Sequence, residues 1–340
     1  MECKLVQYAI DDAIASHASL VSFDFGSDIF CDASLSVKRA SHLTIDALGA
    51  TLWFTGSSGF LISESANVTL RNVTIDYEEL PYLQMTAIAD GRRSGSSGAF
   101  EVNLTTDRGS LDPIIFWARF AHDPANEFVQ GPQWWSPGLS GLYTSPPYDK
   151  AFSGFNATAQ MRRIRPGAFT FRSAMHSPAA KPPCKGDKLT VVVRKGITLH
   201  THNSTRCRFE DVSIHSAPYM AVTEFDGVGG HVYERVTVGR RPGIASATDL
   251  CGRPNSPRVC LALVSSNADV FHSSGCRDGP RLTNVSFSYA MDDYLNVHSR
   301  AQVVATRLTD TSLLVIDPRL SKDDAIADDS PYGTVERLTH

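Results

Sequence analysis

The chain repeats one short pattern along its length, and this repeat limits the folds that it can adopt. Four segments carry an apolar residue at the third position, valine at the sixth and an apolar residue at the eighth: residues 68–75, 207–214, 231–238 and 280–287. Their valines are Val73, Val212, Val236 and Val285, and the last three are separated by 24 and 49 residues. A period of about 24 residues with only short strands is typical of a solenoid, whose coils stack at the ~4.8 Å spacing of paired strands. We therefore predict an all-β fold, a right-handed parallel β-helix. The interval of 49 residues is about two periods long, and we expect residues 259–264 to form the coil between Val236 and Val285.

Apolar residues near the start predict a helix outside this repeat. Those that share one helical face are Leu5, Ala9, Ile10, Ala13 and Ile14. Their spacing is that of an amphipathic helix. We expect this helix to cover the open edge of the first coil.

A long interval interrupts the repeat. Val73 and Val212 are 139 residues apart, and alternating and turn-rich stretches fill the space between them. We expect an inserted β-rich, barrel-like subdomain at residues 84–195. The cap helix and the first coils then occupy residues 1–83, and the coils that carry the active site occupy residues 196–340. Within the insertion, Trp134 and Trp135 either stack on a sugar or belong to a local hydrophobic core.

Composition excludes several classes of partner. The chain has 32 Lys and Arg against 36 Asp and Glu, a formal net charge of −4, and no basic block. Nucleic acid is therefore not expected as the main partner, because nothing is arranged to neutralise phosphates. No apolar run approaches the ~18 residues that indicate a membrane span. The sequence leaves the oligomeric state open.

Cysteines and glycosylation motifs bear on the cellular compartment. The seven cysteines contain no C-x-x-C pair, which excludes zinc-ribbon and thioredoxin-like sites. Cys251 and Cys260 bracket a proline-rich segment in which a local disulfide fits. Six N-x-[S/T] motifs begin at Asn67, Asn72, Asn103, Asn156, Asn203 and Asn284. They favour a secreted glycoprotein. Since no signal segment precedes the first helix, we expect the chain to be either a fragment or an incomplete gene model.

Three aspartates fall in register with the repeat. Asp269 precedes Asp292 by 23 residues and Asp293 by 24, so coils of that period place the three carboxyl groups on one face. Neighbouring like charges keep at least one carboxyl group protonated beside ionised partners. Glycoside hydrolysis needs this division, one acid for the leaving oxygen and one base for water, ~6.5–9.5 Å apart in an inverting enzyme. The trio is therefore the candidate catalytic site, with His272, Asn296 and His298 beside it.

Other interpretations of these residues remain open. Each aspartate taken alone fits a turn or an edge ladder, and clustered carboxylates also bind calcium, although no EF-hand or nonapeptide calcium repeat is present. His200 and His202 share one strand face, but a zinc site needs a third ligand that the sequence does not identify. We therefore expect no metal and no cofactor.

The same residues resemble a known enzyme family. The run Arg241-Pro242-Gly243, the segment from Asp269 to Cys276, and the pattern Asp292-Asp293-x-x-Asn296-Val297-His298 resemble the α-1,3-galactosidases of glycoside hydrolase family 110. Residues 72–77 and 212–220 fit the coils of that family, and the similarity covers about residues 35–310. The whole constellation is fairly specific, whereas an Asp-Asp pair alone is shared with polygalacturonases.

The resemblance implies a function. It indicates an inverting exo-enzyme that removes terminal α-1,3-linked galactose from oligosaccharides or glycoconjugates, on a right-handed β-helix with an inserted barrel and no metal. Asp292 would be the general acid, Asp269 and Asp293 would hold the water as base, and His272, Asn296 and His298 would bind sugar hydroxyls. Val270 replaces a glycine usual in the family, so the resemblance predicts crowding beside Asp269, and Ser299 replaces a second glycine.

The sequence leaves two other functions open. A pectinase-like endo-hydrolase of galacturonan would carry Gly-His-Gly and Arg-x-Lys motifs, and neither occurs. A non-catalytic glycan-binding β-helix would bind sugar without turnover.

Overall fold

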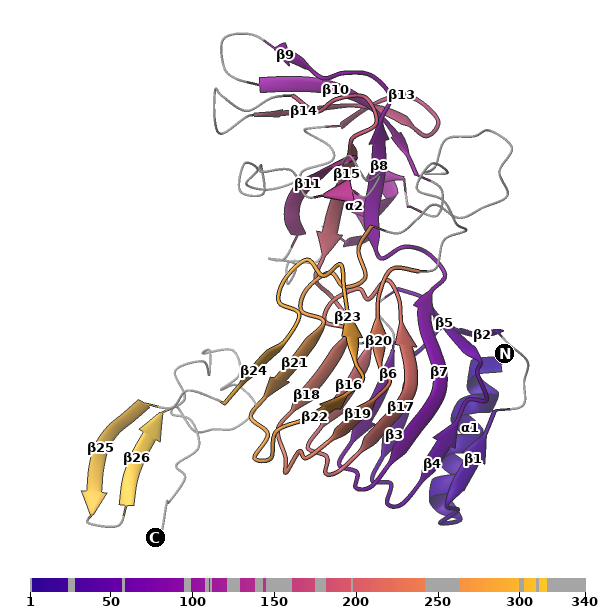
Figure 1. Ribbon diagram of the computed structural model, residues 1–340, viewed down its shortest axis with the longest axis vertical. Helices are drawn as coiled ribbons and strands as arrows, with labels where there is room; N and C mark the ends of the chain where they lie inside the picture. The colour runs from indigo at the N-terminus through magenta and orange to yellow at the C-terminus, as the bar shows by residue number, and fades with distance from the viewer. Residues whose placement is uncertain are drawn as a thin grey trace.

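A computed structural model of the protein describes residues 2–23, 28–56, 59–94, 99–107, 110, 112–120, 129–137, 143–144, 161–174, 182–196, 198–241, 263–299, 303–309 and 312–316. Their regular structure is mostly β-strand, and the predicted all-β fold is confirmed (Figure 1). In the described part of the chain, no helix is long and apolar enough to cross a membrane.

Two parallel sheets form the stacked coils in the lower part of Figure 1. The first contains β1 (Leu20–Ser22), β2 (Asp28–Cys31), β4 (Thr44–Asp46), β5 (Thr51–Phe54), β7 (Thr69–Tyr77), β17 (Arg208–Ile214), β19 (Val232–Glu234), β20 (Thr237–Val238), β22 (Arg281–Thr283) and β23 (Ser286–Phe287). The second contains β3 (Leu35–Lys38), β6 (Phe60–Ser63), β16 (Leu199–His202), β18 (Val222–Phe225), β21 (Phe271–Ser274) and β24 (Asn296–His298). Residues that alternate along these strands face a continuous apolar interior.

The strand register reproduces the repeat of the sequence. Val73 pairs with Val212 across β7 and β17, and Ser213 pairs with Thr237, 24 residues later. Thr237 in turn pairs with Ser286. The apolar pattern therefore sets the register, because a shift by one residue would turn every buried side chain to solvent.

The prediction of a separate coil at residues 259–264 is wrong. β20 pairs directly with β23, and β18 pairs directly with β21, so no coil lies between them. Residues 242–262 lie outside the described residues. Leu263 and Val264, the end of the predicted 259–264 coil, pack against Leu80, Tyr82 and Val192 rather than inside the solenoid. The 49-residue interval therefore adds one coil to the stack instead of two.

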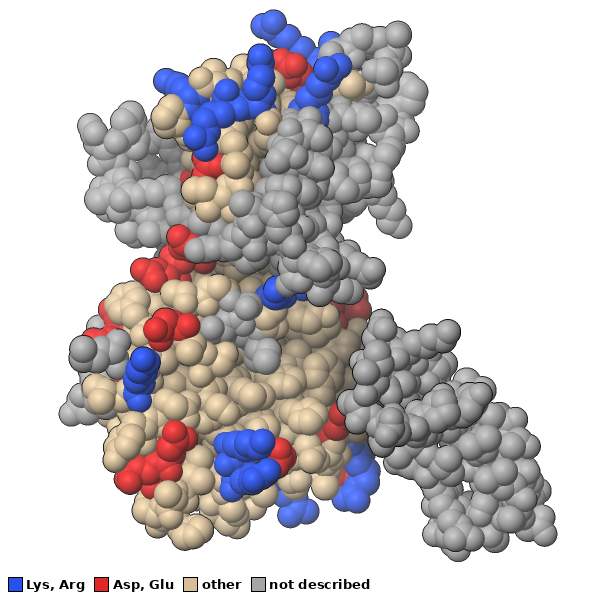
Figure 2. Space-filling view, turned by 180° about the vertical axis from the view of Figure 1, so that it is seen from behind, with Lys and Arg blue, Asp and Glu red and all other residues tan. Residues whose placement is uncertain are grey.

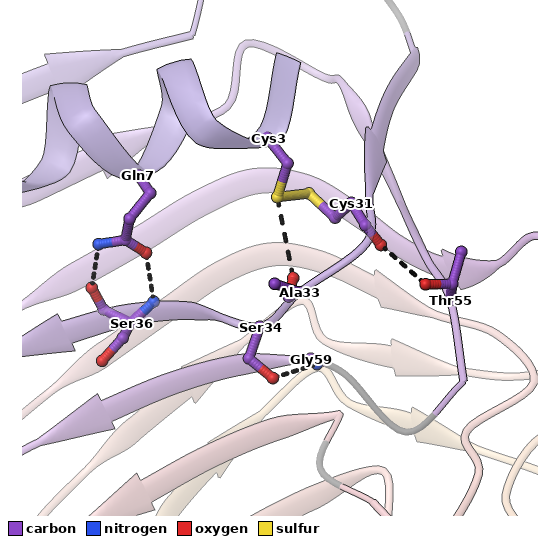
Figure 3. The surroundings of a disulfide bond; sticks show 8 residues. All are labelled: Cys3, Gln7, Cys31, Ala33, Ser34, Ser36, Thr55 and Gly59. Carbon is purple, nitrogen blue, oxygen red and sulfur yellow. Dashed lines mark hydrogen bonds between the residues drawn. A yellow bond between two sulfur atoms is a disulfide. The ribbon is translucent and has the colours of Figure 1, made fainter. Parts of the chain in front are cut away.

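Helix α1 (Glu2–Ala15) covers the first coil, as expected (Figure 1). Its buried face is Cys3, Val6, Ile10 and Ala13, whereas Leu5 is 50% exposed, so the face predicted from Leu5 is rotated. The Gln7 side chain exchanges two hydrogen bonds with the backbone of Ser36 on the edge strand β3, at 2.8 and 2.9 Å. A disulfide between Cys3 and Cys31 ties the helix to β2 (Figure 3). These links satisfy and cover an edge that would otherwise pair with another chain.

An antiparallel sheet lies above the upper ends of the coil strands, at the top of Figure 1. Its strands are β8 (Tyr82–Ala87), β9 (Arg92–Ser94), β10 (Ala99–Thr106), β11 (Val129–Pro137), β12 (Tyr143–Thr144), β13 (Met161–Arg165), β14 (Ala168–Ala174) and β15 (Lys188–Val193). It has a separate apolar core, to which Phe116 of α2 (Pro113–Phe120) contributes. Lys188 Nζ and Asp107 Oδ2 form a buried ion pair at 2.6 Å inside the same sheet. The predicted limits of this insertion, residues 84–195, stay a prediction.

The charges of the described surface are unevenly distributed. Figure 2 shows Lys and Arg gathered at the outer end of the antiparallel sheet, away from the coils. The arginines of this region are Arg92, Arg93, Arg162, Arg163, Arg165 and Arg172. The last two strands, β25 (Val303–Thr309) and β26 (Ser312–Ile316), form an antiparallel hairpin outside these sheets.

Candidate active site

Stacked turns between the two sheets position the three aspartates. Asp269 lies just before β21, and Asp292 and Asp293 lie before β24 in the next coil. The Val270 amide donates to the Asp293 carbonyl at 2.9 Å, and the Ala221 amide donates to the Asp269 carbonyl at 3.1 Å. The turns thus continue the parallel pairing of the strands, and the register that aligns the apolar residues also aligns these carboxyl groups.

The three carboxyl groups converge. One oxygen each from Asp269, Asp292 and Asp293 lies within 4.8 Å of the other two. Asp269 is buried, with 5% of its surface exposed, whereas Asp292 and Asp293 are exposed. This upper limit lies below the ~6.5–9.5 Å of an inverting pair. The nearest oxygens are therefore closer together than the sequence analysis predicted.

Two side chains from neighbouring coils hold Asp269. Its Oδ2 lies 2.7 Å from His272 Nδ1 and accepts a hydrogen bond from Asn296 Nδ2 at 3.2 Å. His272 pairs with Asn296 in the β21–β24 register, so both reach the same carboxylate from adjacent strands. The predicted neighbours of the trio thus touch its buried member directly.

A second histidine extends this contact. His298 Nε2 lies 3.1 Å from His272 Nε2, and His298 Nδ1 lies 3.1 Å from the Ser299 carbonyl. His272 and His298 thus link the buried carboxyl group of Asp269 to the backbone at Ser299.

Arg194 is a site residue that the sequence analysis missed. Its Nη2 donates to Asp292 Oδ2 at 2.5 Å, from the residue that follows β15 of the antiparallel sheet. The two residues are 98 positions apart, so no local motif signals the contact. The insertion thereby contributes a guanidinium group to the carboxyl cluster of the coils.

Tyr219 is a second missed neighbour, within the segment 212–220 that resembles family coils. Burial raises the pKa of its half-buried hydroxyl, the nearby Asp269 and Asp292 raise it further, and Arg194 opposes them. The phenol therefore stays neutral and can donate a hydrogen bond beside the trio.

The antiparallel sheet also braces the turn before Asp269. Gln84 Oε1 accepts a hydrogen bond from the Leu263 amide at 3.0 Å, and the Tyr82 hydroxyl donates to the Val264 carbonyl at 3.2 Å. Asn267 Nδ2 donates to the Pro81 carbonyl at 3.0 Å. Tyr82 and Gln84 both belong to β8, the first strand of that sheet in chain order. The position of the buried carboxylate thus depends on contacts from outside the coils.

Several predicted site residues lie elsewhere. Trp134 and Trp135 belong to β11 and pair with Leu189 and Lys188, but their side chains lie outside the described residues, so their sugar contact stays a prediction. Cys251 and Cys260 also lie outside them. Val270 is fully buried in the solenoid core, so the predicted crowding beside Asp269 is wrong, because this side chain faces the interior.

Metal binding has limited support in the described residues. The trio is close enough to hold a hard cation, but Arg194, His272 and Asn296 already donate to its oxygens. His202 Nε2 lies 3.8 Å from Asp226 Oδ2. Among the described residues, the ligand atoms of His200, His202 and Asp226 do not converge as a set that could hold a zinc ion.

Comparisons with known proteins bear on this site. No family model matches the chain. It is similar to two curated proteins named alpha-1,3-galactosidase A: 26% identity over 277 residues with that of Bacteroides fragilis strain ATCC 25285, and 26% over 280 residues with that of strain YCH46. Each match covers 78% of this chain and 39% of the relative, so the chain spans about two fifths of the length of these relatives. The predicted resemblance to the α-1,3-galactosidases is thus confirmed at the level of sequence similarity.

Proposed function

We propose that the chain carries the catalytic site of an exo-acting, inverting glycoside hydrolase that releases terminal α-1,3-linked galactose from glycans. The convergence of Asp269, Asp292 and Asp293 within 4.8 Å is the observation that supports a glycoside hydrolase site in this chain. The similarity to proteins named alpha-1,3-galactosidase A supports the linkage and the sugar. The family resemblance supports the inverting outcome.

In the proposed reaction the three carboxyl groups divide the work. Asp292 protonates the glycosidic oxygen, while Asp269 and Asp293 orient a water molecule and take its proton. Asp292 is 41% exposed at its side chain, so a rotation about its Cα–Cβ bond opens the wider separation that the attacking water needs when the sugar enters. The guanidinium group of Arg194, which donates to Asp292 Oδ2, offsets part of the repulsion among the three carboxyl groups.

The surrounding residues complete the proposed site. Asn296 and Tyr219 offer hydrogen-bond donors to sugar hydroxyls beside the trio. The reaction needs no cofactor, because acid, base and water supply all its chemistry. We place the protein in a secretory compartment, supported by the glycosylation motifs and by the Cys3–Cys31 disulfide, a bond typical of oxidising compartments.

Matched aspartate variants test the proposal. The protein is incubated with α-1,3-linked and α-1,4-linked galactosides, and released galactose is measured. We expect release from the α-1,3-linked compound only, and a loss of at least about 10²–10⁴-fold in kcat for Asp292→Asn and for Asp269→Asn, the range for general acid–base groups. Asp278→Asn, an exposed aspartate of the same coil, serves as the control and should keep wild-type kcat.

Two outcomes contradict the proposal. A folded protein that binds α-galactosides without turnover is a binding module. Wild-type turnover by Asp269→Asn excludes the trio as the catalytic site.

A further inference from the structure

A row of rings crosses the outer face of the second parallel sheet. His200 and His202 of β16 stack at 6.3 Å between ring centroids. Phe225 of β18 lies 5.3 Å from His200 and 5.6 Å from His272 of β21. We call these four side chains the ring ladder. They point outward, because the residues between them, such as Thr201 and Glu224, are buried.

The ring ladder is continuous with the candidate catalytic site. His272, its last member, contacts Asp269 at 2.7 Å. The register sets His272 opposite Thr223, and Thr223 opposite His200, so each step moves one coil away from the trio. The His200 side chain is fixed by a hydrogen bond with the Thr223 hydroxyl. The rings thus form a track that begins where the scissile bond would lie.

The spacing of this track fits a sugar chain. Coils lie ~4.8 Å apart, close to the length of one pyranose residue in a glycan. The C–H face of a pyranose lies well against an aromatic ring, whose face carries partial negative charge. Phe225 is half-buried and His202 is 50% exposed at its side chain, so both offer surface to a ligand.

Polar groups beside the rings suit an uncharged ligand. Asp226 is 32% exposed at its side chain and lies beside His202, where its carboxylate can accept hydrogen bonds from hydroxyl groups. Burial lowers the pKa of His200 to about 4, with His202 adding to the effect. A neutral imidazole and a carboxylate give no attraction to a uronate or a sulfated sugar. The track therefore favours neutral hexoses.

We propose that His200, His202 and Phe225 form an aglycone subsite, which binds the second and third sugars on the leaving side of the galactosidic bond. This assignment rests on the proposed function. The terminal galactose lies at the trio and the first aglycone sugar lies beside His272. A longer neutral glycan then continues along β18 and β16.

The test compares two substrates that differ only in length. The disaccharide galactosyl-α-1,3-galactose ends at the first aglycone sugar, and a tetrasaccharide with the same terminal linkage reaches the ring ladder. The wild-type protein should show kcat/KM about threefold to tenfold higher for the tetrasaccharide, the scale of an aromatic contact. Phe225→Leu and His202→Ala should each bring this ratio close to one.

Controls separate the possible failures. His42→Ala, an exposed histidine on an early coil, should leave the ratio at its wild-type value. Equal kcat/KM for both substrates in the wild-type protein overturns the subsite, and so does a ratio that neither Phe225→Leu nor His202→Ala changes. Absence of turnover of both substrates by folded protein overturns the proposed function itself, and the subsite with it.

Discussion

Arg194 shows how single residues outside the repeat shape the site. Its side chain is 17% exposed and donates to Asp292 at 2.5 Å. Because hydrogen bonds to charged groups contribute about 1.5–3 kcal/mol, we expect Arg194→Ala to lower kcat by about 10- to 100-fold. Arg194→Lys should recover part of the loss, since an ammonium group keeps the charge but not the planar donor pair. Steady-state kinetics on the α-1,3-linked disaccharide measure both effects, and wild-type kcat for Arg194→Ala would contradict them.

Glu224 makes the stability of the folded protein depend on pH. It is fully buried in β18, and its register neighbours are Thr201 and Ser273. Burial raises the pKa of Glu224 to about 7, and the nearby Ser273 and Tyr233 side chains offset only part of this rise. In the unfolded state, the carboxyl group loses its proton near the ordinary pKa value of glutamate. The folded state keeps this proton to higher pH. The stability that this proton contributes is full below that ordinary value, falls as the pH rises, and is lost above about pH 7.

This titration predicts a pH-dependent difference between the protein and Glu224→Gln. Relative to that variant, the wild-type protein should lose about 2–3 kcal/mol of unfolding free energy between about pH 5 and pH 8, at ~1.36 kcal/mol per unit of pKa difference. Urea unfolding at the two pH values measures it. Glu101→Gln, at an exposed strand position, is the control and should show no such change. A constant difference between wild type and Glu224→Gln would mean that Glu224 is ionised in the core.

Among the elements, α1 depends on a covalent link that the sequence analysis did not identify. The Cys3–Cys31 disulfide closes a loop of 28 residues between the helix and β2. Chain-entropy arguments assign a loop of this size about 3–4 kcal/mol of stability. We expect the double variant Cys3→Ser, Cys31→Ser to unfold at a lower Tm by several degrees.

Calorimetry with and without reductant checks this expectation. The wild-type protein should lose stability on reduction, whereas the double variant should be insensitive to it. Equal Tm values for the oxidised protein and the double variant would show that the packing of Val6 and Ile10 alone holds the helix.

At the scale of the whole molecule, the repeat predicts the part of the site that the coils themselves build. The positions of Asp269, Asp292 and Asp293 follow from a period of 23–24 residues, because parallel register copies the sequence interval into space. The same reasoning fails where the chain leaves the coils. Residues 259–264 carry the alternation of a strand, but Leu263 and Val264 use their apolar side chains against the insertion instead.

Contacts between the insertion and the coils also could not be predicted from the sequence. Arg194 and Gln84 reach the site only because an antiparallel sheet folds over the turns of the solenoid. Nothing in their local sequence distinguishes them from other polar residues at strand ends. The prediction that Leu5 lies on the buried face of α1 is wrong for a related reason. Several faces of a short helix are partly apolar, and the coil beneath α1 determines which of them is buried.

The stereochemistry of galactose release tests the central claim most directly. The α-1,3-linked disaccharide is mixed with the protein in an NMR tube, and the anomeric protons of the product are followed before mutarotation. The proposed site predicts β-galactose as the first product, because water attacks from the face opposite the leaving oxygen. First release of α-galactose would contradict this account and would mean that one carboxylate of the closely spaced trio attacks the sugar directly.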